Sequence, residues 1–145
     1  MLKITIKSTL KNTEKKIDKK IVALNQAIHQ SGLLLETAIK QDIASYPSVD
    51  TGRFLGSIES DLSKPLQASV FTRVKYAKFL EYGTSPHFIL PKTKKVLAWK
   101  GGGKWFFSKG HMVRGIKPRR HFGRTANKMA PIIRAYIEGK MKEVV

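Results

Sequence analysis

A helical repeat of apolar residues runs through the first third of the chain and constrains the fold more than any other feature. Between about residues 9 and 45, isoleucine and leucine recur at steps of three and four residues, which places them on one face of an α-helix. Tyr46-Pro47 ends the run, because the residue before a proline is pushed out of the α region. The sequence therefore predicts a long amphipathic helix. Its apolar stripe consists of Ile17, Ile21, Leu24, Ile28, Leu35, Ile39 and Ile43, with Gly32 in the missing position.

Shorter patterns on both sides of this helix predict strands. Residues 2–7 alternate between apolar and polar side chains, as a half-buried strand does. Residues 58–63 and 66–74 predict two strands joined at Lys64-Pro65. Between these strands and the long helix, Asp50 or Thr51 is expected to cap a short segment over residues 52–57.

The second half of the chain predicts a short helix, a hairpin and a terminal helix. Residues 76–82 favour a short helix that Gly83 stops in the left-handed αL conformation. The aromatic-rich runs 96–100 and 104–108 flank three glycines, which indicates a β-hairpin. Residues 109–120 are expected to form an extended loop. Helical spacing then returns, and Pro131 is expected either to kink the last helix or to mark its start. The spaced apolar residues are Phe122, Ala126, Met129, Ile133, Ile137 and Met141.

This order of elements predicts a single α+β domain over residues 1–145, a mostly antiparallel sheet packed by a long N-terminal helix and a C-terminal helix. A hairpin and a basic loop are expected at about residues 89–120. There is no cysteine, so no disulfide or zinc-thiolate site is expected. No apolar run approaches the roughly 20 residues that a membrane span needs, and a soluble cytoplasmic protein without a membrane partner is expected.

The charge of the chain is unusual and unevenly distributed. The formal net charge is +18; residues 1–64 carry a net of +3, and residues 65–145 carry 18 Lys and Arg against 3 carboxylates. No Asp or Glu lies between Glu81 and Glu138. This pattern favours a basic surface that faces nucleic acid or an acidic protein, with a purely solubilising surface as the alternative.

Three arrangements resemble catalytic or ligand sites, and each has a simpler interpretation. Gly101-Gly102-Gly103-Lys104 has Trp105 where a phosphate loop has Ser or Thr, so a hairpin turn is the better interpretation. The histidines of the basic half match no compact metal site, and the positive field disfavours a cation. Glu81 and His87, with Arg119 and Arg120 on a phosphate, are the acid–base arrangement of a small ribonuclease, but nothing distinguishes them from surface residues. We therefore expect no catalytic site, metal or cofactor. The histidines considered are His87, His111 and His121.

Aromatic residues and lysines alternate around the glycine turn. On a strand, Trp105 and Phe107 share one face and Phe106 takes the other, so at least one large aromatic side chain is expected to be exposed. An exposed aromatic side chain favours an intersubunit contact, and a platform on which single-stranded nucleic acid stacks is the alternative.

Three segments carry a resemblance to a known family. They are Val49-Asp50-Thr51-Gly52-Arg53-Phe54-Leu55-Gly56-Ser57-Ile58, Tyr76-Ala77-Lys78-Phe79-Leu80-Glu81-Tyr82-Gly83-Thr84 and Lys117-Pro118-Arg119-Arg120-His121-Phe122. Their order resembles that of the small tail-component or head–tail joining family of long-tailed bacteriophages. That family has V-D-T-G-x-L-x-x-S-I, then Y-A-x-x-x-E-x-G-T, then K-P-x-P-F before a last helix. The resemblance covers about residues 15–143, with Phe54 where leucine is usual.

The resemblance implies a non-enzymatic ring subunit at the virion head–tail junction, made in the host cytoplasm. Its partners would be neck, portal-side or tail proteins and further copies of itself, with non-specific DNA contact allowed by the charge. Glu81 is expected to pair with Arg53 or Arg119. The structural roles that the motifs imply fall on Asp50, Thr51, Gly52, Arg53, Tyr76, Glu81, Gly83 and Thr84. Contacts with a partner or DNA are expected at Lys92, Lys94, Lys95, Lys100, Lys104, Trp105, Arg119, Arg120 and Arg124.

The alternative function is a basic nucleic-acid-binding module or a small ribonuclease toxin. Such a module would bind tightly at low salt and lose affinity steeply as salt rises.

Overall fold

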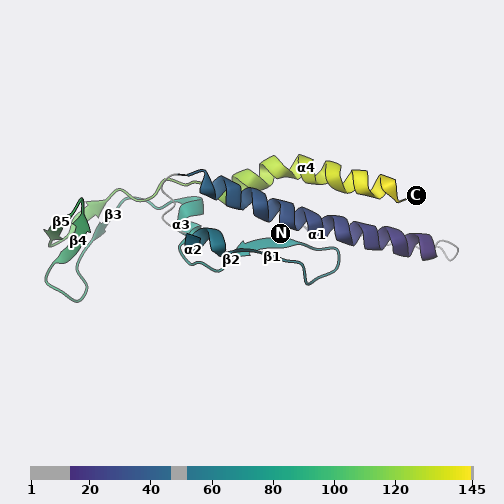
Figure 1. Ribbon diagram of the computed structural model, residues 1–145. Helices are drawn as coiled ribbons and strands as arrows, with labels where there is room; N and C mark the ends of the chain where they lie inside the picture. The colour runs from purple at the N-terminus through teal and green to yellow at the C-terminus, as the bar shows by residue number, and fades with distance from the viewer. Residues whose placement is uncertain (1–13, 47–51, 145) are drawn as a thin grey trace. The chain divides into compact units, whose positions relative to one another are not determined.

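The computed structural model describes residues 14–46 and 52–144 (Figure 1). The predicted strand at residues 2–7 and the predicted capping residues Asp50 and Thr51 lie outside these ranges. The chain divides into two compact units, one formed by residues 1–73 and 124–145 and the other by residues 74–123. We refer to them as the helical unit and the basic unit. The fold class is α+β, as predicted.

The long helix α1 spans Glu14–Ala44 and confirms the helical prediction. Ile39 and Ile43 on its stripe are 1% and 0% exposed, whereas Ile21 is 47% exposed. A 31-residue helix is about 46 Å long. The four-residue strands packed against it reach only about 13 Å, so they cover a part of its length. The stripe is therefore buried most deeply near its C-terminal end.

Helix α2 (Gly52–Gly56) and the strands β1 (Ile58–Asp61) and β2 (Ser69–Thr72) complete the core on α1. The strands are antiparallel, with Ile58 opposite Thr72 and Asp61 opposite Ser69, as the sequence predicts. Phe54 and Ile58 are 3% and 1% exposed, and together with the buried isoleucines of α1 they form the centre of the unit.

Gly32 allows the chain before β2 to approach α1 closely. A Cβ atom at Gly32 would lie 2.7 Å from the Cβ of Ala68, a separation that real Cβ atoms do not show. The same loop is fixed by the amide oxygen of Asn25, which accepts a hydrogen bond of 2.7 Å from the backbone N–H of Leu66. Glycine in the apolar stripe is therefore a packing requirement, not an interruption of the helix.

Helix α4 spans His121–Glu143 and contains Pro131 as its eleventh residue. Pro131 therefore does not mark the start of the helix, which was one of the two expectations for it. Its ring nitrogen has no N–H to donate to the carbonyl one turn earlier, but the helix continues on both sides. None of the helices in residues 14–46 and 52–144 is long and apolar enough to cross a membrane.

The basic unit contains helix α3 (Ala77–Tyr82) and two further two-stranded antiparallel sheets. The predicted hairpin is confirmed as β4 (Leu97–Gly101) and β5 (Lys104–Ser108), and its turn residues Gly102 and Gly103 have φ of 56° and 79°. Positive φ at both turn positions is what a tight hairpin needs and what glycine supplies.

The extended loop predicted over residues 109–120 contains a strand that the sequence did not reveal. Strand β6 (His111–Val113) pairs with β3 (His87–Ile89), with Phe88 opposite Met112. Each strand has only three residues and lies among glycines and prolines, so no alternation long enough to be recognised was present. The described residues form three two-stranded sheets that share no strand, in place of the single sheet expected from the sequence.

Candidate functional site

The second and third motif segments meet where α3 ends and α4 begins. The carboxylate of Glu81 accepts hydrogen bonds from the backbone N–H groups of Phe122 (3.0 Å, Oε2) and Gly123 (2.8 Å, Oε1). These N–H groups belong to the first turn of α4, where a helix has no internal acceptors and carries partial positive charge. Glu81 therefore caps α4, a role that differs from the arginine pairing expected from the sequence.

The same junction satisfies the end of α3. The backbone N–H of Arg119 donates to the carbonyl oxygen of Leu80 at 2.8 Å, and that of Arg120 donates to the carbonyl of Glu81 at 3.2 Å. The last carbonyl groups of a helix have no hydrogen-bond donors within the helix, and here the two N–H groups after the third motif provide the donors. Each helix thus provides or receives the groups that the other one needs, and we call residues 80–84 and 116–123 together the α3–α4 junction.

Gly83 and Thr84 fix the chain on the other side of the junction. Gly83 has φ 74° and ψ −179°, and a Cβ atom there would lie 2.5 Å from the carbonyl oxygen of Ile116. The predicted αL conformation of Gly83 is therefore wrong. The observed φ and ψ are nevertheless in a region that essentially only glycine adopts, so the need for glycine at this position is as predicted. Thr84 then pairs with Ile116, its N–H donating to the Ile116 carbonyl at 2.9 Å and its carbonyl accepting at 3.2 Å.

The remaining motif residues that the structure describes lie elsewhere. Gly52 and Arg53 are exposed in α2, while the neighbouring Phe54 is buried. Tyr76 precedes α3 and is 38% exposed. The motif residues therefore divide between two places, and those of the second and third segments form the α3–α4 junction.

The hairpin exposes aromatic rings on both of its faces. Trp99 and Phe106 are cross-strand neighbours whose ring centroids lie 5.7 Å apart, and they are 40% and 45% exposed. Trp105 and Phe107 lie on the other face, 6.5 Å apart and 63% and 66% exposed. The predicted sharing of faces is confirmed, and so is the exposure of a large aromatic side chain.

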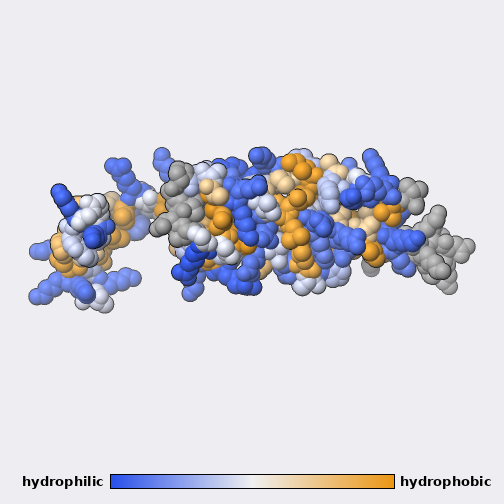
Figure 2. Space-filling view, in the orientation of Figure 1, coloured by the Kyte–Doolittle hydropathy of each residue, from blue (hydrophilic) through white to orange (hydrophobic). Residues whose placement is uncertain are grey.

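Further apolar side chains are exposed on β3, directly after it and on β6. Phe88, Leu90 and Met112 are 56%, 63% and 62% exposed. The ring of His111 on β6 lies 4.8 Å from that of Trp99, which joins the two sheets of the basic unit. Figure 2 shows hydrophobic surface over these strands with hydrophilic side chains projecting around it. We call these exposed side chains, namely Phe88, Leu90 and Met112 together with the four rings of the hairpin, the aromatic surface.

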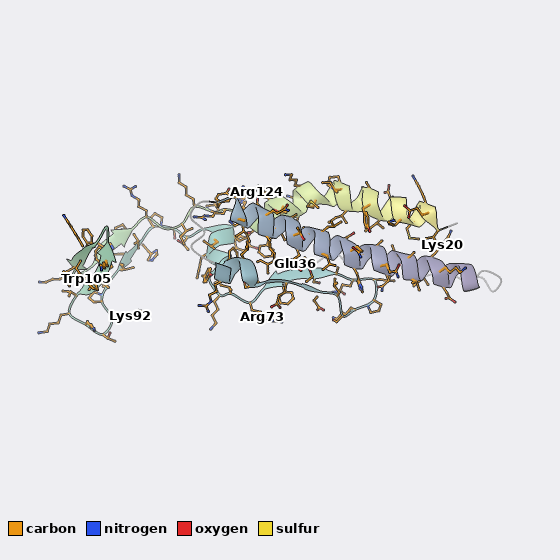
Figure 3. All side chains as sticks on the ribbon, in the orientation of Figure 1. Lys20, Glu36, Arg73, Lys92, Trp105 and Arg124 are labelled. Atoms are coloured by element: carbon orange, nitrogen blue, oxygen red, sulfur yellow. The ribbon has the colours of Figure 1, made fainter. Side chains whose placement is uncertain are left out.

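Lysines surround the aromatic surface. Figure 3 labels Trp105 on β5 and Lys92 in the loop that leads to β4. Lys100 and Lys104 belong to the hairpin strands themselves. The basic unit carries twelve Lys and Arg and a single carboxylate, that of Glu81, which caps α4. The predicted contact residues that are exposed near the aromatic surface are Lys92, Lys94, Lys95, Lys100, Lys104 and Trp105.

The three predicted contact arginines are placed differently. Arg119 and Arg120 belong to the α3–α4 junction through their backbone, and Arg120 has φ 51°. Arg124 lies in the helical unit, where its guanidinium donates to both carboxylate oxygens of Asp42 at 2.7 Å. Its side chain is therefore engaged by α1 within the helical unit.

The histidines do not form a common site. His87 Nδ1 lies 3.1 Å from the carbonyl oxygen of Ser85, His111 contacts Trp99, and His121 is 1% exposed at the start of α4. Among the described residues there is no group of three or more His, Cys, Asp or Glu placed to hold a metal ion. A groove of about 710 Å³ runs beside β3 and β6 and is lined mainly by apolar side chains, among them Phe79, Ile89 and Val113.

Comparisons of the chain with family models, with curated proteins and with solved structures find no match.

The sequence analysis did not predict that Glu81 caps α4. The available signal was that Glu81 is the sole acid of a strongly basic stretch and precedes the last helix.

Proposed function

We propose that this chain is a structural, non-enzymatic subunit of the connector between the head and the tail of a bacteriophage. In this role it joins a ring with further copies of itself and contacts portal-side, neck or tail proteins. The proposal starts from the resemblance of three ordered segments to the head–tail joining family of long-tailed phages.

The observation that carries the proposal is the use of the motif residues in the α3–α4 junction. Glu81, Gly83 and Thr84 each contact the segment that contains the third motif, at Gly123, Pro118 and Ile116 respectively. Two motifs that lie more than thirty residues apart therefore have a shared structural purpose. Motif residues whose contacts build the fold suit an assembly protein.

The exposed aromatic surface is consistent with this role. Exposed apolar surfaces of this kind in a soluble protein mark sites where other proteins bind. A ring subunit needs such surfaces, because its heterologous interfaces are filled only in the assembled particle.

The test is deletion of the gene from the prophage or phage that carries it. We expect DNA-filled heads and free tails that fail to join, and restoration of intact particles when the gene is supplied from a plasmid. Cryo-electron microscopy of intact particles should place the chain at the head–tail junction. Normal particles from the deletion strain, or intact particles that lack the chain, would refute the proposal.

A second candidate, a basic nucleic-acid-binding module, is favoured by the combination of exposed rings and lysines on the hairpin. Titration with single-stranded DNA and RNA at low ionic strength tests it, and absence of binding eliminates it. Cleavage of RNA that is lost in His87→Ala would instead support a ribonuclease.

A further inference from the structure

Neither face of the hairpin is fully covered: the ring of His111 lies against Trp99 on one face, but the aromatic side chains of both faces stay exposed. A two-stranded sheet usually presents one face to the core and the other to water, and in isolation it is only marginally stable. Here Trp99 and Phe106 on one face, and Trp105 and Phe107 on the other, all remain at least 40% exposed. Water on both faces leaves a large apolar area unburied, so a partner that covers both faces would stabilise the hairpin.

The exposed apolar side chains are not only aromatic. Leu90, directly after β3, and Met112 on β6 are also more than 60% exposed. A nucleic acid recognises a protein surface through phosphate contacts and through bases that stack on ring faces. It offers little to an aliphatic side chain, whereas a protein buries leucine, methionine and aromatic side chains alike.

The charge around the aromatic surface specifies the partner further. Lys92, Lys94 and Lys95 precede the hairpin, Lys100 and Lys104 lie in it, and Lys109 follows it, with no Asp or Glu between Glu81 and Glu138. Two hairpins from two copies of the chain would therefore bring positive charges together without a carboxylate to separate them. An acidic surface of a different protein complements the lysines.

We propose that the aromatic surface binds an acidic protein, which encloses the hairpin on both faces and pairs its carboxylates with the surrounding lysines. The chemistry of this partner follows from the surface itself; its location in the phage connector rests on the proposed function. Binding buries the four rings of the hairpin and desolvates Lys100 and Lys104 at the edge of the contact.

Site-specific photo-crosslinking in the host cell tests this inference. The full chain is expressed during phage growth with p-benzoylphenylalanine in place of Trp105, and cells are irradiated before lysis. A matched probe replaces Val22, which is 56% exposed on α1. We expect position 105, and not position 22, to give a discrete protein adduct that survives nuclease treatment and whose crosslinked peptide is rich in Asp and Glu.

Charge reversal supplies the second measurement. Lys100→Glu with Lys104→Glu should lower the yield of the adduct at least tenfold, since both lysines would then repel the acidic surface. Lys19→Glu with Lys20→Glu makes the same change in net charge on an exposed part of α1 and should leave the yield unchanged. Circular dichroism of the purified variants verifies that each is folded.

Three outcomes overturn the inference: an adduct that nuclease removes, a protein adduct without an acidic contact region or without dependence on Lys100 and Lys104, and no adduct at position 105. The identity of an acidic partner separates this test from that of the proposed function. A phage structural protein supports both, whereas an acidic host protein supports the inference and contradicts the connector role.

Discussion

Arg124 and Asp42 form a two-pronged ion pair between α4 and α1. Two hydrogen bonds of 2.7 Å join the guanidinium to the two carboxylate oxygens, and a third of 2.8 Å joins it to the hydroxyl of Tyr46. The hydrogen bonds to Tyr46 and to Asp42 raise the pKa of Arg124 above its already high ordinary value. The planar guanidinium fits a carboxylate in this way and a lysine would not. The pair therefore ties α4 to the end of α1 in the helical unit.

Replacing Asp42 with asparagine should weaken this connection. Asp42→Asn removes the negative charge and one of the two acceptors, and we expect a loss of about 1 kcal/mol in the free energy of unfolding. The melting temperature should fall by a few degrees in a thermal denaturation experiment. Asp18→Asn, an exposed change on the same helix, is the control. Equal melting temperatures for the two variants would contradict a stabilising role of the pair.

The capping of α4 by Glu81 predicts a local effect. Glu81→Ala removes both acceptors from the first turn, and we expect a destabilisation of about 1–2 kcal/mol. Hydrogen exchange at the amides of Phe122 and Gly123 should accelerate, since these two N–H groups lose their acceptor. Glu138→Ala, in the exposed part of α4, controls for loss of a negative charge. Unchanged exchange at both amides would show that the carboxylate is not needed there.

Two glycines predict opposite responses to the same substitution. Gly83→Ala places a Cβ against the Ile116 carbonyl in a backbone region that costs other residues on the order of 1–3 kcal/mol, so the protein should be destabilised. Gly139→Ala introduces a Cβ with nothing within 4 Å inside a helix, and should stabilise by about 0.5–1 kcal/mol. Chemical denaturation measures both. A Gly83→Ala protein as stable as the parent would be incompatible with the close approach at Ile116.

The hydrogen bonds of Glu36 predict that the helical unit loses stability in acid. Hydrogen bonds from Lys40 (2.6 Å) and Ser60 (2.5 Å) lower the pKa of its carboxyl below the ordinary value of 4.5. A lowered pKa in the folded state means that this stabilisation is present above about pH 4.5 and is lost as the pH falls through the folded value.

Glu36→Gln should therefore flatten the decline of stability on acidification, measured as denaturant midpoints at a series of pH values from 7 downward. Lys40→Met should flatten it as well, because Lys40 is the largest cause of the shift. Parallel curves for the parent and both variants would indicate that the Glu36 carboxylate contributes nothing in this range.

The sequence predicted the elements whose cause is local. The spacing of Ile39 and Ile43 identified α1, and three consecutive glycines identified the hairpin, because a helical period and a turn are properties of neighbouring residues. Strands β3 and β6 were missed, since a three-residue strand such as His87–Ile89 forms only through its partner. Gly83 was recognised as a stop, but its conformation is set by Ile116 and Pro118, which lie more than thirty residues away.

The sequence predicted which kinds of residue are exposed at the candidate site, but not which residues contact one another. The exposure of Trp105 follows from a strand in which three aromatic residues are consecutive. The role of Glu81 depends on the distant Phe122 and Gly123, and that of Arg124 on Asp42, 82 positions earlier. Charge counts alone could not distinguish a residue that holds the fold from one that faces a partner.

The pairing of Thr84 with Ile116 has a consequence for how such chains can diverge. Residues 85–115 begin and end at one point, where Thr84 and Ile116 are joined by two backbone hydrogen bonds of 2.9 and 3.2 Å. Insertions, deletions or complete exchange of this excursion need not disturb the capped helices that carry it. Residues 85–115 can therefore be exchanged between related chains as one segment, and an attempt to change the binding partner can begin by transplanting this whole segment.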